Sequence, residues 1–189
     1  KTIFGYPGAA ICPFYDALLG SNITHVLTRN EQGAAHSASG YAGVTGKPGV
    51  CVATSGPGAT NLITGIATAY MDSIPMVAIT GQVALELIGR DVFQEVDITG
   101  ATAPFCKHNY LVKNVQELPR IIKEAFHIAA TGRPGPVVID VPVDVQNSTI
   151  DFHYPDTVDI KGYKPTYKGH AMQIRRAAAA LEDAKRPVI

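Results

Sequence analysis

Residues 49–70 read GVCVATSGPGATNLITGIATAY, an apolar run followed by a glycine-proline-glycine turn and a helical pattern. An uninterrupted apolar run is typical of a strand in a parallel sheet whose two faces are covered by helices. The turn at Gly56-Pro57-Gly58 would leave backbone N–H groups free at the positive end of the next helix, where an anionic or hydrogen-bonding ligand can bind. A tight strand-to-helix connection needs the same glycines, so both interpretations stay open. Asn61 stands in place of the third glycine of a dinucleotide fingerprint, and no P-loop Gly-Lys-Ser/Thr is present.

The same alternation continues outward from this unit. Further short apolar runs lie at residues 2–4, 24–28, 75–80, 110–114 and 136–141, and helical patterns lie near 10–20, 31–44, 58–71 and 116–131. Strands that alternate with helices through short turns predict an α/β fold. We expect an open, mostly parallel six-stranded sheet with helices on both faces.

The pattern at 116–131 is the clearest of the helical ones. Apolar residues recur with the spacing of one buried face, at Leu118, Ile121, Ile122, Ala125, Phe126 and Ala129. We expect Lys123, Glu124 and His127 to face away from that core. Gly132 and Pro134 are expected to end the helix.

The sequence changes character after Val145. Residues 148–170 are polar, hold two prolines and show no sustained period, so they are interpreted as a linker after a first domain at 1–147. Helix and strand patterns resume at 171–189, which we interpret as the truncated start of a second domain. Because both chain ends fall in apolar runs, we expect a fragment of a longer protein.

Composition narrows the classes of function. Hydrophobic residues make up 46% and charged residues 17%, and 16 basic residues balance 16 acidic ones. This balance argues against binding to nucleic acid or to an anionic membrane, and no apolar run is long enough to span a membrane. Cys12, Cys51 and Cys106 are odd in number and lack paired spacing, which predicts reduced, buried thiols in a cytoplasmic protein.

One acid stands out in RNEQGAAHSASGYA, residues 29–42, directly after a predicted strand. Glu31 is surrounded by small residues, and Ala34, Ala35 and Ala38 share its face of the predicted helix. An acid in the first helical turn gains about 0.3–1 kcal/mol from the helix dipole, which would account for Glu31 without a ligand. The small residues would equally let a flat ligand, a partner subunit or a neighbouring helix approach closely.

Residues 81–109 are long and of mixed polarity, with no regular element predicted, and segments of this length are usually functional or mobile. Phe93-Gln94-Glu95 could grip a ring, but such a triplet is also common in plain loops. Lys107-His108-Asn109 could be catalytic by composition, but three adjacent polar residues more often form a solvated turn, which is the prediction for them. We interpret His36 and His127 as surface or satisfied residues. No set of His, Asp and Glu has metal-ligand spacing, and no Ser or Cys has an evident His partner, so any catalysis is predicted to belong to a cofactor.

Seven stretches together resemble the thiamine-diphosphate enzymes in order and spacing, most of all the catalytic subunit of acetohydroxyacid (acetolactate) synthase. They are FGYPGA, RNEQGAAHSASGYA, ATSGPGATN, AYMDSIPMVAITGQV, DVFQE, KHNYLV and GRPGPVVIDVPVDVQ. The resemblance covers residues 1 to about 147 as the pyrimidine-binding domain. The tail resembles the beginning of the family's central, FAD-associated domain.

The resemblance implies roles for individual residues. Glu31 would hydrogen-bond N1′ of the cofactor's aminopyrimidine and promote removal of the thiazolium C2 proton, which needs a carboxyl group in a dry, ring-sized slot. Other implied positions are Gly56, Pro57 and Asn61 by the pyrimidine, Gln94 near cofactor and substrate with Phe93 beside it, and Arg133 at a structural FAD. The diphosphate and Mg²⁺ would be held by a C-terminal domain, whose GDG…N pattern is absent from this chain.

The implied activity is that of a transferase. Pyruvate would be decarboxylated and joined to a second 2-ketoacid, giving 2-acetolactate or 2-aceto-2-hydroxybutyrate on the way to branched-chain amino acids. The complete site would lie between two subunits, so at least a homodimer is implied, with a regulatory small subunit as a further partner. The fragment alone is expected to be inactive.

Five positions depart from the usual family pattern: Asn30, Ser39, Gly43, Ala84 and Val143. Ala84 stands where proline is common, and Val143 replaces a lysine that lines the substrate channel in the family, so the second 2-ketoacid stays open. The alternative is a sister enzyme of the sulfoacetaldehyde acetyltransferase or glyoxylate carboligase type, although the latter typically lacks an acid at the position of Glu31. A non-catalytic flavin- or nucleotide-binding domain and an oligomerisation module leave the motifs less well explained.

Overall fold

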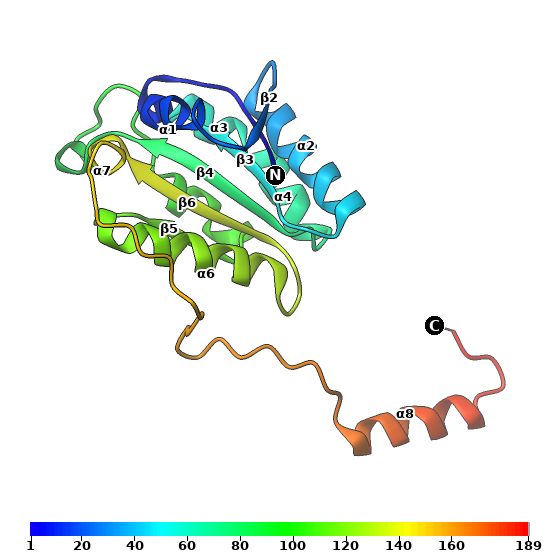
Figure 1. Ribbon diagram of the computed structural model, residues 1–189. Coiled ribbons are helices and arrows are strands. Elements are labelled where there is room, and N and C mark those ends of the chain that lie inside the picture. The colour runs from blue at the N-terminus through cyan, green and yellow to red at the C-terminus, as the bar shows by residue number, and fades with distance from the viewer. Residues whose placement is uncertain (189) are drawn as a thin grey trace.

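A computed structural model describes residues 1–188 and contains a six-stranded sheet in which all neighbouring strands are parallel. The strands are β1 (Thr2–Gly5), β2 (Thr24–Leu27), β3 (Gly49–Ala53), β4 (Met76–Gln82), β5 (His108–Leu111) and β6 (Pro136–Pro142). They lie in the order β2-β1-β3-β4-β6-β5 (Figure 1). The predicted six-stranded α/β fold is confirmed, and the sheet is parallel throughout.

Helices fill most of the connections between the strands. The α-helices are α1 (Cys12–Leu18), α2 (Glu31–Thr45), α3 (Pro57–Asn61), α4 (Ile63–Met71), α5 (Ile98–Thr102), α6 (Leu118–Ala130), α7 (Val143–Gln146) and α8 (Ala171–Asp183). Single 3-10 turns occur at η1 (Ala9–Ile11), η2 (Leu85–Leu87), η3 (Ala103–Phe105) and η4 (Val115–Glu117). The helix expected at 58–71 is therefore two helices, because the chain is divided at Leu62.

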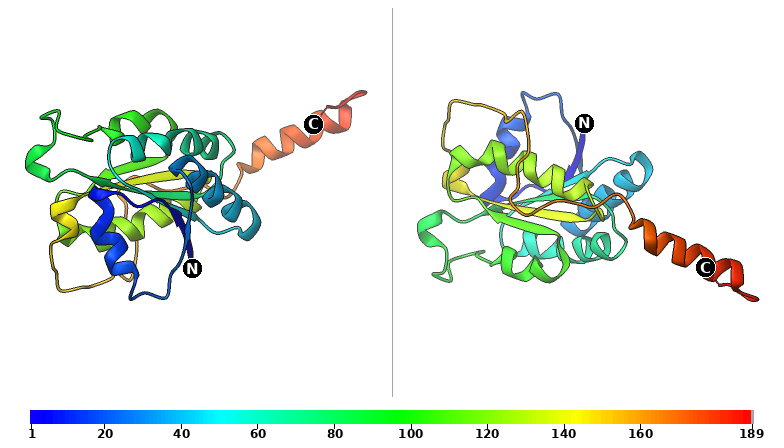
Figure 2. Two further views of the ribbon diagram at one scale, coloured as in Figure 1. Left: turned by 90° about the horizontal axis from the view of Figure 1, so that it is seen from above. Right: turned by 90° about the horizontal axis from the view of Figure 1, so that it is seen from below.

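The central strands are apolar on both faces because helices cover both faces (Figure 2). Alternate residues of each strand enter two separate hydrophobic clusters. One cluster includes Val52, Val77 and Ile139 and lies beneath α1 and α6. The other includes Ala78 and Val138 and lies beneath α2 and α4.

The strand order contains a switch point between β1 and β3. The chain goes from β1 outward to β2 on one side of the sheet, and from β3 outward to β4 on the other side. In open α/β sheets ligands bind at such a point, beyond the carboxyl ends of the strands. The fold therefore predicts a ligand position beyond Gly5 and Ala53.

Helix α2 packs closely because small residues line its inner face. Ala34, Ala35 and Ala38 are fully buried. A methyl group on Gly49 of β3 would overlap the carbonyl oxygen of Ala38, and one on Gly65 of α4 would overlap the methyl group of Ala35. The sequence left open whether a ligand, a partner subunit or a neighbouring helix approaches these small residues. The structure shows a neighbouring helix, α4.

Two glycines in helix interiors give a matched test of this packing. Gly65→Ala should lower the free energy of unfolding by about 1–3 kcal/mol because the added methyl overlaps Ala35. Gly40→Ala in α2 should raise it by about 0.5–1 kcal/mol, since a methyl there meets no atom within 4 Å and alanine favours helix. Urea unfolding of both variants measures the difference. Equal effects of the two substitutions would contradict close packing of α2 against α4.

The prediction that Glu124 faces away from the core was wrong. Glu124 is buried. Its Oε2 accepts a hydrogen bond from the Tyr110 hydroxyl at 3.0 Å and forms an ion pair with Arg120 at 2.7 Å. Burial, followed by the contact with Glu124, raises the pKa of Tyr110. Tyr110 belongs to β5, so the helical pattern alone could not reveal this partner.

The predicted solvated turn at residues 107–109 was also wrong. His108 and Asn109 open β5. Lys107 Nζ donates to the carbonyl oxygens of Ile128 and Thr131 at the end of α6, where a cation is favoured by the helix dipole. His36 is exposed as expected, whereas Cys12 is exposed although all three thiols were expected to be buried.

The segment at 81–109 holds more regular structure than predicted. β4 continues to Gln82, and η2, α5 and η3 follow before β5 begins. Asp97 caps α5, since its side chain accepts from Gly100 N at 2.8 Å. The prediction of no regular element there was wrong because these pieces are too short to show a period.

Residues 148–170 contain no helix or strand, yet two of their side chains, Ile160 and Tyr163, pack against the sheet domain. The Tyr163 hydroxyl accepts a hydrogen bond from Lys107 Nζ at 3.1 Å. Helix α8 follows, and its described residues are exposed (Figure 1). The domain boundaries stay predictions. Within residues 1–188 no helix is both long and apolar enough to cross a membrane.

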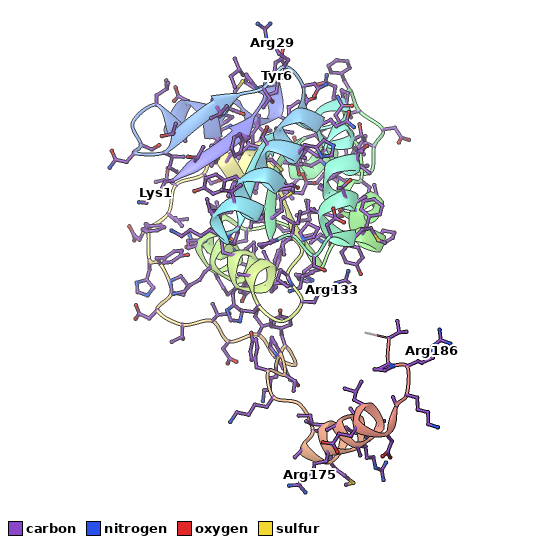
Figure 3. The ribbon with its side chains drawn as sticks, turned by 90° about the vertical axis from the view of Figure 1, so that its right-hand side faces the viewer. Lys1, Tyr6, Arg29, Arg133, Arg175 and Arg186 are labelled. Atoms are coloured by element: carbon purple, nitrogen blue, oxygen red, sulfur yellow. The ribbon has the colours of Figure 1, made fainter. Side chains whose placement is uncertain are left out.

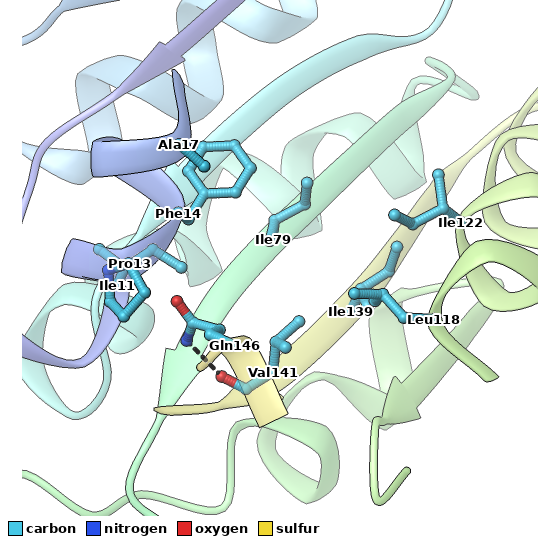
Figure 4. Close-up of a pocket in the computed structure, with 10 residues that line it drawn as sticks. All are labelled: Ile11, Pro13, Phe14, Ala17, Ile79, Leu118, Ile122, Ile139, Val141 and Gln146. Carbon is cyan, nitrogen blue, oxygen red and sulfur yellow. Dashed lines mark hydrogen bonds between the residues drawn. The ribbon is translucent and has the colours of Figure 1, made fainter. Parts of the chain in front are cut away.

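An apolar cavity of about 160 Å³ opens over β4 and β6, between α1 and α6 (Figure 4). Phe14, Ile79, Ile122 and Ile139 line it, and Gln146 Nε2 donates to the carbonyl oxygen of Val141 at 2.8 Å at its edge. This cavity lies on the sheet face opposite α2, so it is separate from Glu31.

Candidate functional site

The candidate site lies at the carboxyl edge of the sheet. Glu31, Gly56 and Gln94 follow β2, β3 and β4, so all three lie beyond the carboxyl ends of parallel strands. Figure 3 labels Tyr6 and Arg29, which follow β1 and β2, at this same end of the molecule. The position agrees with the switch point of the sheet.

Glu31 is the first residue of α2 and is 7% exposed. The preceding Asn30 caps the helix, because its side-chain oxygen accepts from Gly33 N at 2.8 Å. Asn61 Nδ2 donates to Glu31 Oε2 at 2.9 Å. Among residues 1–188 no hydrogen-bond donor is directed at Oε1. The cap and Asn61 therefore fix the carboxyl group and leave one of its oxygens available.

Glycines keep that oxygen open. A methyl group on Gly58 would lie 3.2 Å from Glu31 Oε1 and 2.7 Å from Thr54 Cγ2. Thr54 directly follows β3, and its hydroxyl accepts from Ala10 N at 3.1 Å, which ties the end of β3 to the segment after β1. A Cβ at Gly8 would overlap Thr54 as well. The space beside Glu31 thus depends on two positions without side chains.

The turn after β3 lies against the loop that carries Gln94. Gly56 has φ +56° and ψ −118°, and a methyl group there would lie 2.6 Å from the carbonyl oxygen of Gln94. Gln94 itself has φ +57°. Phe93 is 87% exposed, and Pro57 is exposed too. The structure therefore brings the predicted residues Glu31, Gly56, Pro57, Asn61 and Gln94 to one place, with Phe93 beside them.

The turn is less suited to an anion than its sequence suggested. Pro57 has no N–H, Gly58 N donates to the carbonyl oxygen of Ser55 at 3.2 Å, and Thr60 N donates to that of Gly56 at 2.9 Å. Helix α3 has five residues. The arrangement presents a carboxylate oxygen rather than a set of free amides, so it favours a partner that carries a proton.

Arg133 lies elsewhere. It precedes β6, so it stands at the amino edge of the sheet, and Figure 3 places it far from Tyr6 and Arg29. Its Nε donates to Ser73 Oγ at 2.7 Å, and its guanidinium lies 5.8 Å from the ring centre of Tyr70. The structure does not bring Arg133 together with Glu31. Its predicted contact with FAD stays a prediction.

Sequence reasoning missed Thr54 and Gly8. A polar residue directly after a buried strand and a glycine beyond the neighbouring strand are a detectable signal, because the carboxyl ends of adjacent parallel strands meet. Among residues 1–188 no group of three or more His, Cys, Asp or Glu side chains could hold a metal ion. The site therefore offers the carboxyl group of Glu31, the side-chain amides of Asn61 and Gln94, and a glycine-lined space.

Residues 1–101 match the family model described as "Thiamine pyrophosphate enzyme, N-terminal TPP binding domain". The match covers more than half of the 189 residues. The chain belongs to this family. The matched residues include Glu31, Gly56, Asn61 and Gln94, whereas Arg133 lies outside them.

Curated relatives of the thiamine pyrophosphate family match nearly the whole chain. It is 56% identical over 192 residues to a probable acetolactate synthase large subunit from Methanocaldococcus jannaschii, covering 100% of this chain and 32% of that protein. It is 56% identical over 188 residues to an acetolactate synthase large subunit from Corynebacterium glutamicum, with 99% and 30% covered. A third, from Buchnera aphidicola, is 56% identical over 190 residues, with 99% and 33% covered. The chain spans about a third of the length of these relatives.

The residues at the switch point fit the aminopyrimidine end of thiamine pyrophosphate. Glu31 is largely buried, and its Oε1, which has no donor among residues 1–188, can share a proton with a ring nitrogen. The missing side chain at Gly58 leaves that oxygen accessible. Glu31, Asn61, Gly56 and Pro57 are the residues that would hold the ring.

Proposed function

We propose that the parent protein of this chain decarboxylates pyruvate with thiamine diphosphate and joins the two-carbon unit to a second 2-ketoacid. The products would be 2-acetolactate or 2-aceto-2-hydroxybutyrate, which belong to branched-chain amino acid biosynthesis. The observation that carries the proposal is the buried Glu31 at the switch point, with Asn61 on one oxygen and no donor among residues 1–188 on the other. Identity of 56% to acetolactate synthase large subunits supports the substrate class.

The chain's own residues would control one proton. Bound thiamine diphosphate supplies the electron sink that decarboxylation of a 2-ketoacid needs. Glu31 Oε1 would hold a proton shared with a nitrogen of the pyrimidine ring. Asn61, 2.9 Å from Oε2, would keep the carboxyl group in one orientation. Because only 7% of Glu31 is exposed, a ring bound over Oε1 would leave little water to compete for the same proton.

Further parts of the proposal concern groups beyond this chain. Gln94 would contact cofactor and substrate, with Phe93 packing beside them, while Mg²⁺ and the diphosphate would bind to a later part of the parent protein. FAD would lie near Arg133. We propose a homodimer or larger assembly whose sites are completed between subunits, with a regulatory small subunit as a further partner. Residues 1–147 would be the pyrimidine-binding domain, 148–170 the linker and 171–189 the start of the central domain.

The second 2-ketoacid would be selected near Ala84 and Val143. The residues that follow them are hydrogen-bonded, since Leu85 N donates to the carboxylate of Asp144 at 3.2 Å. The two departures from the family pattern therefore lie at one corner of the domain. Both side chains are smaller than the proline and lysine usual in the family, so we expect this corner to accept a larger second 2-ketoacid than pyruvate.

Acetolactate formation from pyruvate tests the proposal. The full parent protein with thiamine diphosphate, Mg²⁺ and FAD should form acetolactate, and added 2-ketobutyrate should compete as second substrate. The 189-residue chain alone, used as the matched control, should show no turnover because the part of the parent protein proposed to bind the diphosphate lies outside it. A parent protein that binds the cofactor but forms no acetolactate would overturn the proposed reaction.

A further inference from the structure

A buried polar cluster lies beneath the loop that carries Gln94. Asp140 of β6 is 1% exposed. Thr80 Oγ1 donates to its Oδ1 at 2.7 Å, and Gln82 Nε2 donates to its Oδ2 at 2.9 Å. Burial raises the pKa of Asp140 to about 7, although both hydrogen bonds act to lower it. Burying a carboxyl group costs stability even when it is hydrogen-bonded, so this cluster is not explained by packing alone.

Gln82 links Asp140 to the loop. Its Nε2 donates a second hydrogen bond, to the carbonyl oxygen of Val96 at 2.8 Å, and its Oε1 accepts from Val83 N at 2.9 Å. Both hydrogens of the amide are therefore used. A carboxylate on one side and a carbonyl on the other both accept hydrogen bonds, so they admit the amide in one orientation.

Val96 is the point at which the loop is fastened to the sheet. Upstream of it, the carboxylate of Glu95 accepts hydrogen bonds from the backbone N–H groups of Gly89 and Val92, which close residues 89–95 into a compact turn. Within that turn Gln94 has φ +57°, and its carbonyl oxygen lies against Gly56. The loop is thus a preformed unit, and the bond at Val96 fixes where the unit stands.

We propose that Asp140 and Gln82 are positioning residues that set the place of Gln94 in the cofactor site. Asp140 orients Gln82, Gln82 holds the Val96 carbonyl, and the compact turn transmits that position to Gln94 two residues earlier. The inference rests on the proposed function for the role of Gln94, but the fastening of the loop is a property of this chain alone.

Hydrogen exchange in the full parent protein tests the fastening without any cofactor. Gln82→Met removes both bonds of the amide nitrogen, so the amides of residues 89–96 should exchange roughly tenfold faster or more. Asp140→Val should act in the same direction through a misoriented Gln82, and it serves as the second variant if Gln82→Met does not fold. Unchanged exchange in a folded Gln82→Met or Asp140→Val variant would overturn the proposal.

Two further variants separate positioning from general stability. Asp140→Asn can still accept a hydrogen bond from Gln82, so exchange at residues 89–96 should stay close to that of the parent. Thr80→Val removes the other bond of Asp140 and does not touch the loop, so it should lower stability without accelerating exchange there. Acceleration by Thr80→Val equal to that by Gln82→Met would contradict a specific tether.

A double-mutant cycle tests whether the cluster acts through Gln94. Gln82→Met and Gln94→Ala should each lower kcat/KM for pyruvate, and the double variant should lose less than the product of the two factors. A multiplicative loss would mean that Gln82 does not act through Gln94. If the unaltered parent forms no acetolactate, the proposed function fails, while the exchange experiment still decides on the tether.

Discussion

Glu31→Gln in the parent protein is expected to lower kcat for acetolactate formation by about 10²–10⁴-fold, the usual loss when a positioned acid–base group is removed. Glutamine has nearly the same shape, and its amide oxygen can still accept the hydrogen bond from Asn61. An amide in place of the free oxygen cannot hold a shared proton. The loss should appear at saturating cofactor, measured as acetolactate formed per minute from pyruvate.

Two variants make this result specific to Glu31. Glu117→Gln changes an acid whose partner is Arg120 at 2.9 Å on the surface of the domain, and it should leave kcat essentially unchanged. Asn61→Ala removes the donor to Glu31 but keeps the acid, so the expected loss is smaller, about tenfold. If Glu31→Gln retained more than a tenth of the parent kcat, the role proposed for Glu31 would be wrong.

Gly56→Ala is expected to cause the largest loss of stability, about 3–4 kcal/mol in the free energy of unfolding. Two effects combine at this position. The backbone has φ +56° and ψ −118°, a region that side chains strongly disfavour. The added methyl would also lie 2.6 Å from the carbonyl oxygen of Gln94, so the loop must move. Urea unfolding of the chain measures the loss.

Gly46→Ala is the matched control for backbone strain. Gly46 ends α2 with φ +66° and ψ 12°, and a methyl group there would meet no atom within 4 Å. The expected loss is about 1–2 kcal/mol, the usual cost of the left-handed conformation. A Gly56→Ala variant no less stable than Gly46→Ala would show that the turn and the Gln94 loop do not press on each other.

The sequence predicted the sheet well because its signal is local. A buried parallel strand is a short apolar run, and each of the six runs became a strand. The errors occurred where a distant partner decides the outcome. Glu124 of α6 is buried where Tyr110 of β5 donates a hydrogen bond to it, and Lys107 is anchored because the end of α6 lies beside it. The helical periodicity of the sequence predicts neither of these contacts.

The site residues, like the sheet, could be predicted where the signal is local but not where contacts between distant segments decide. Glu31 and Gly56 could be found because each lies a few residues after the end of a strand, where ligands bind in such folds. Thr54 beside Gly58, and Asp140 beside Gln82, depend on which strands are neighbours and in what register, since β4 pairs with β6 over the full length of both. Arg133 matched a family motif and precedes β6, at the other edge of the sheet from Glu31, and its contact with FAD stays a prediction. The contacts of Thr54 and Asp140 could not be predicted because the sequence does not show the order of the strands in the sheet.

The close packing of α2 also limits how this sequence can change. Its inner face consists of residues that are already among the smallest available, and they meet glycines on β3 and α4 that would overlap them if enlarged. A single substitution toward greater bulk on either side therefore lowers stability, and a second, compensating change would be needed to restore the packing. Laboratory libraries should therefore tolerate larger side chains more readily at the exposed positions of α2, such as Gln32 and His36, than at Ala34, Ala35 and Ala38. Glu31, at the start of α2, therefore lies on a helix whose position is fixed by its close contacts with β3 and α4.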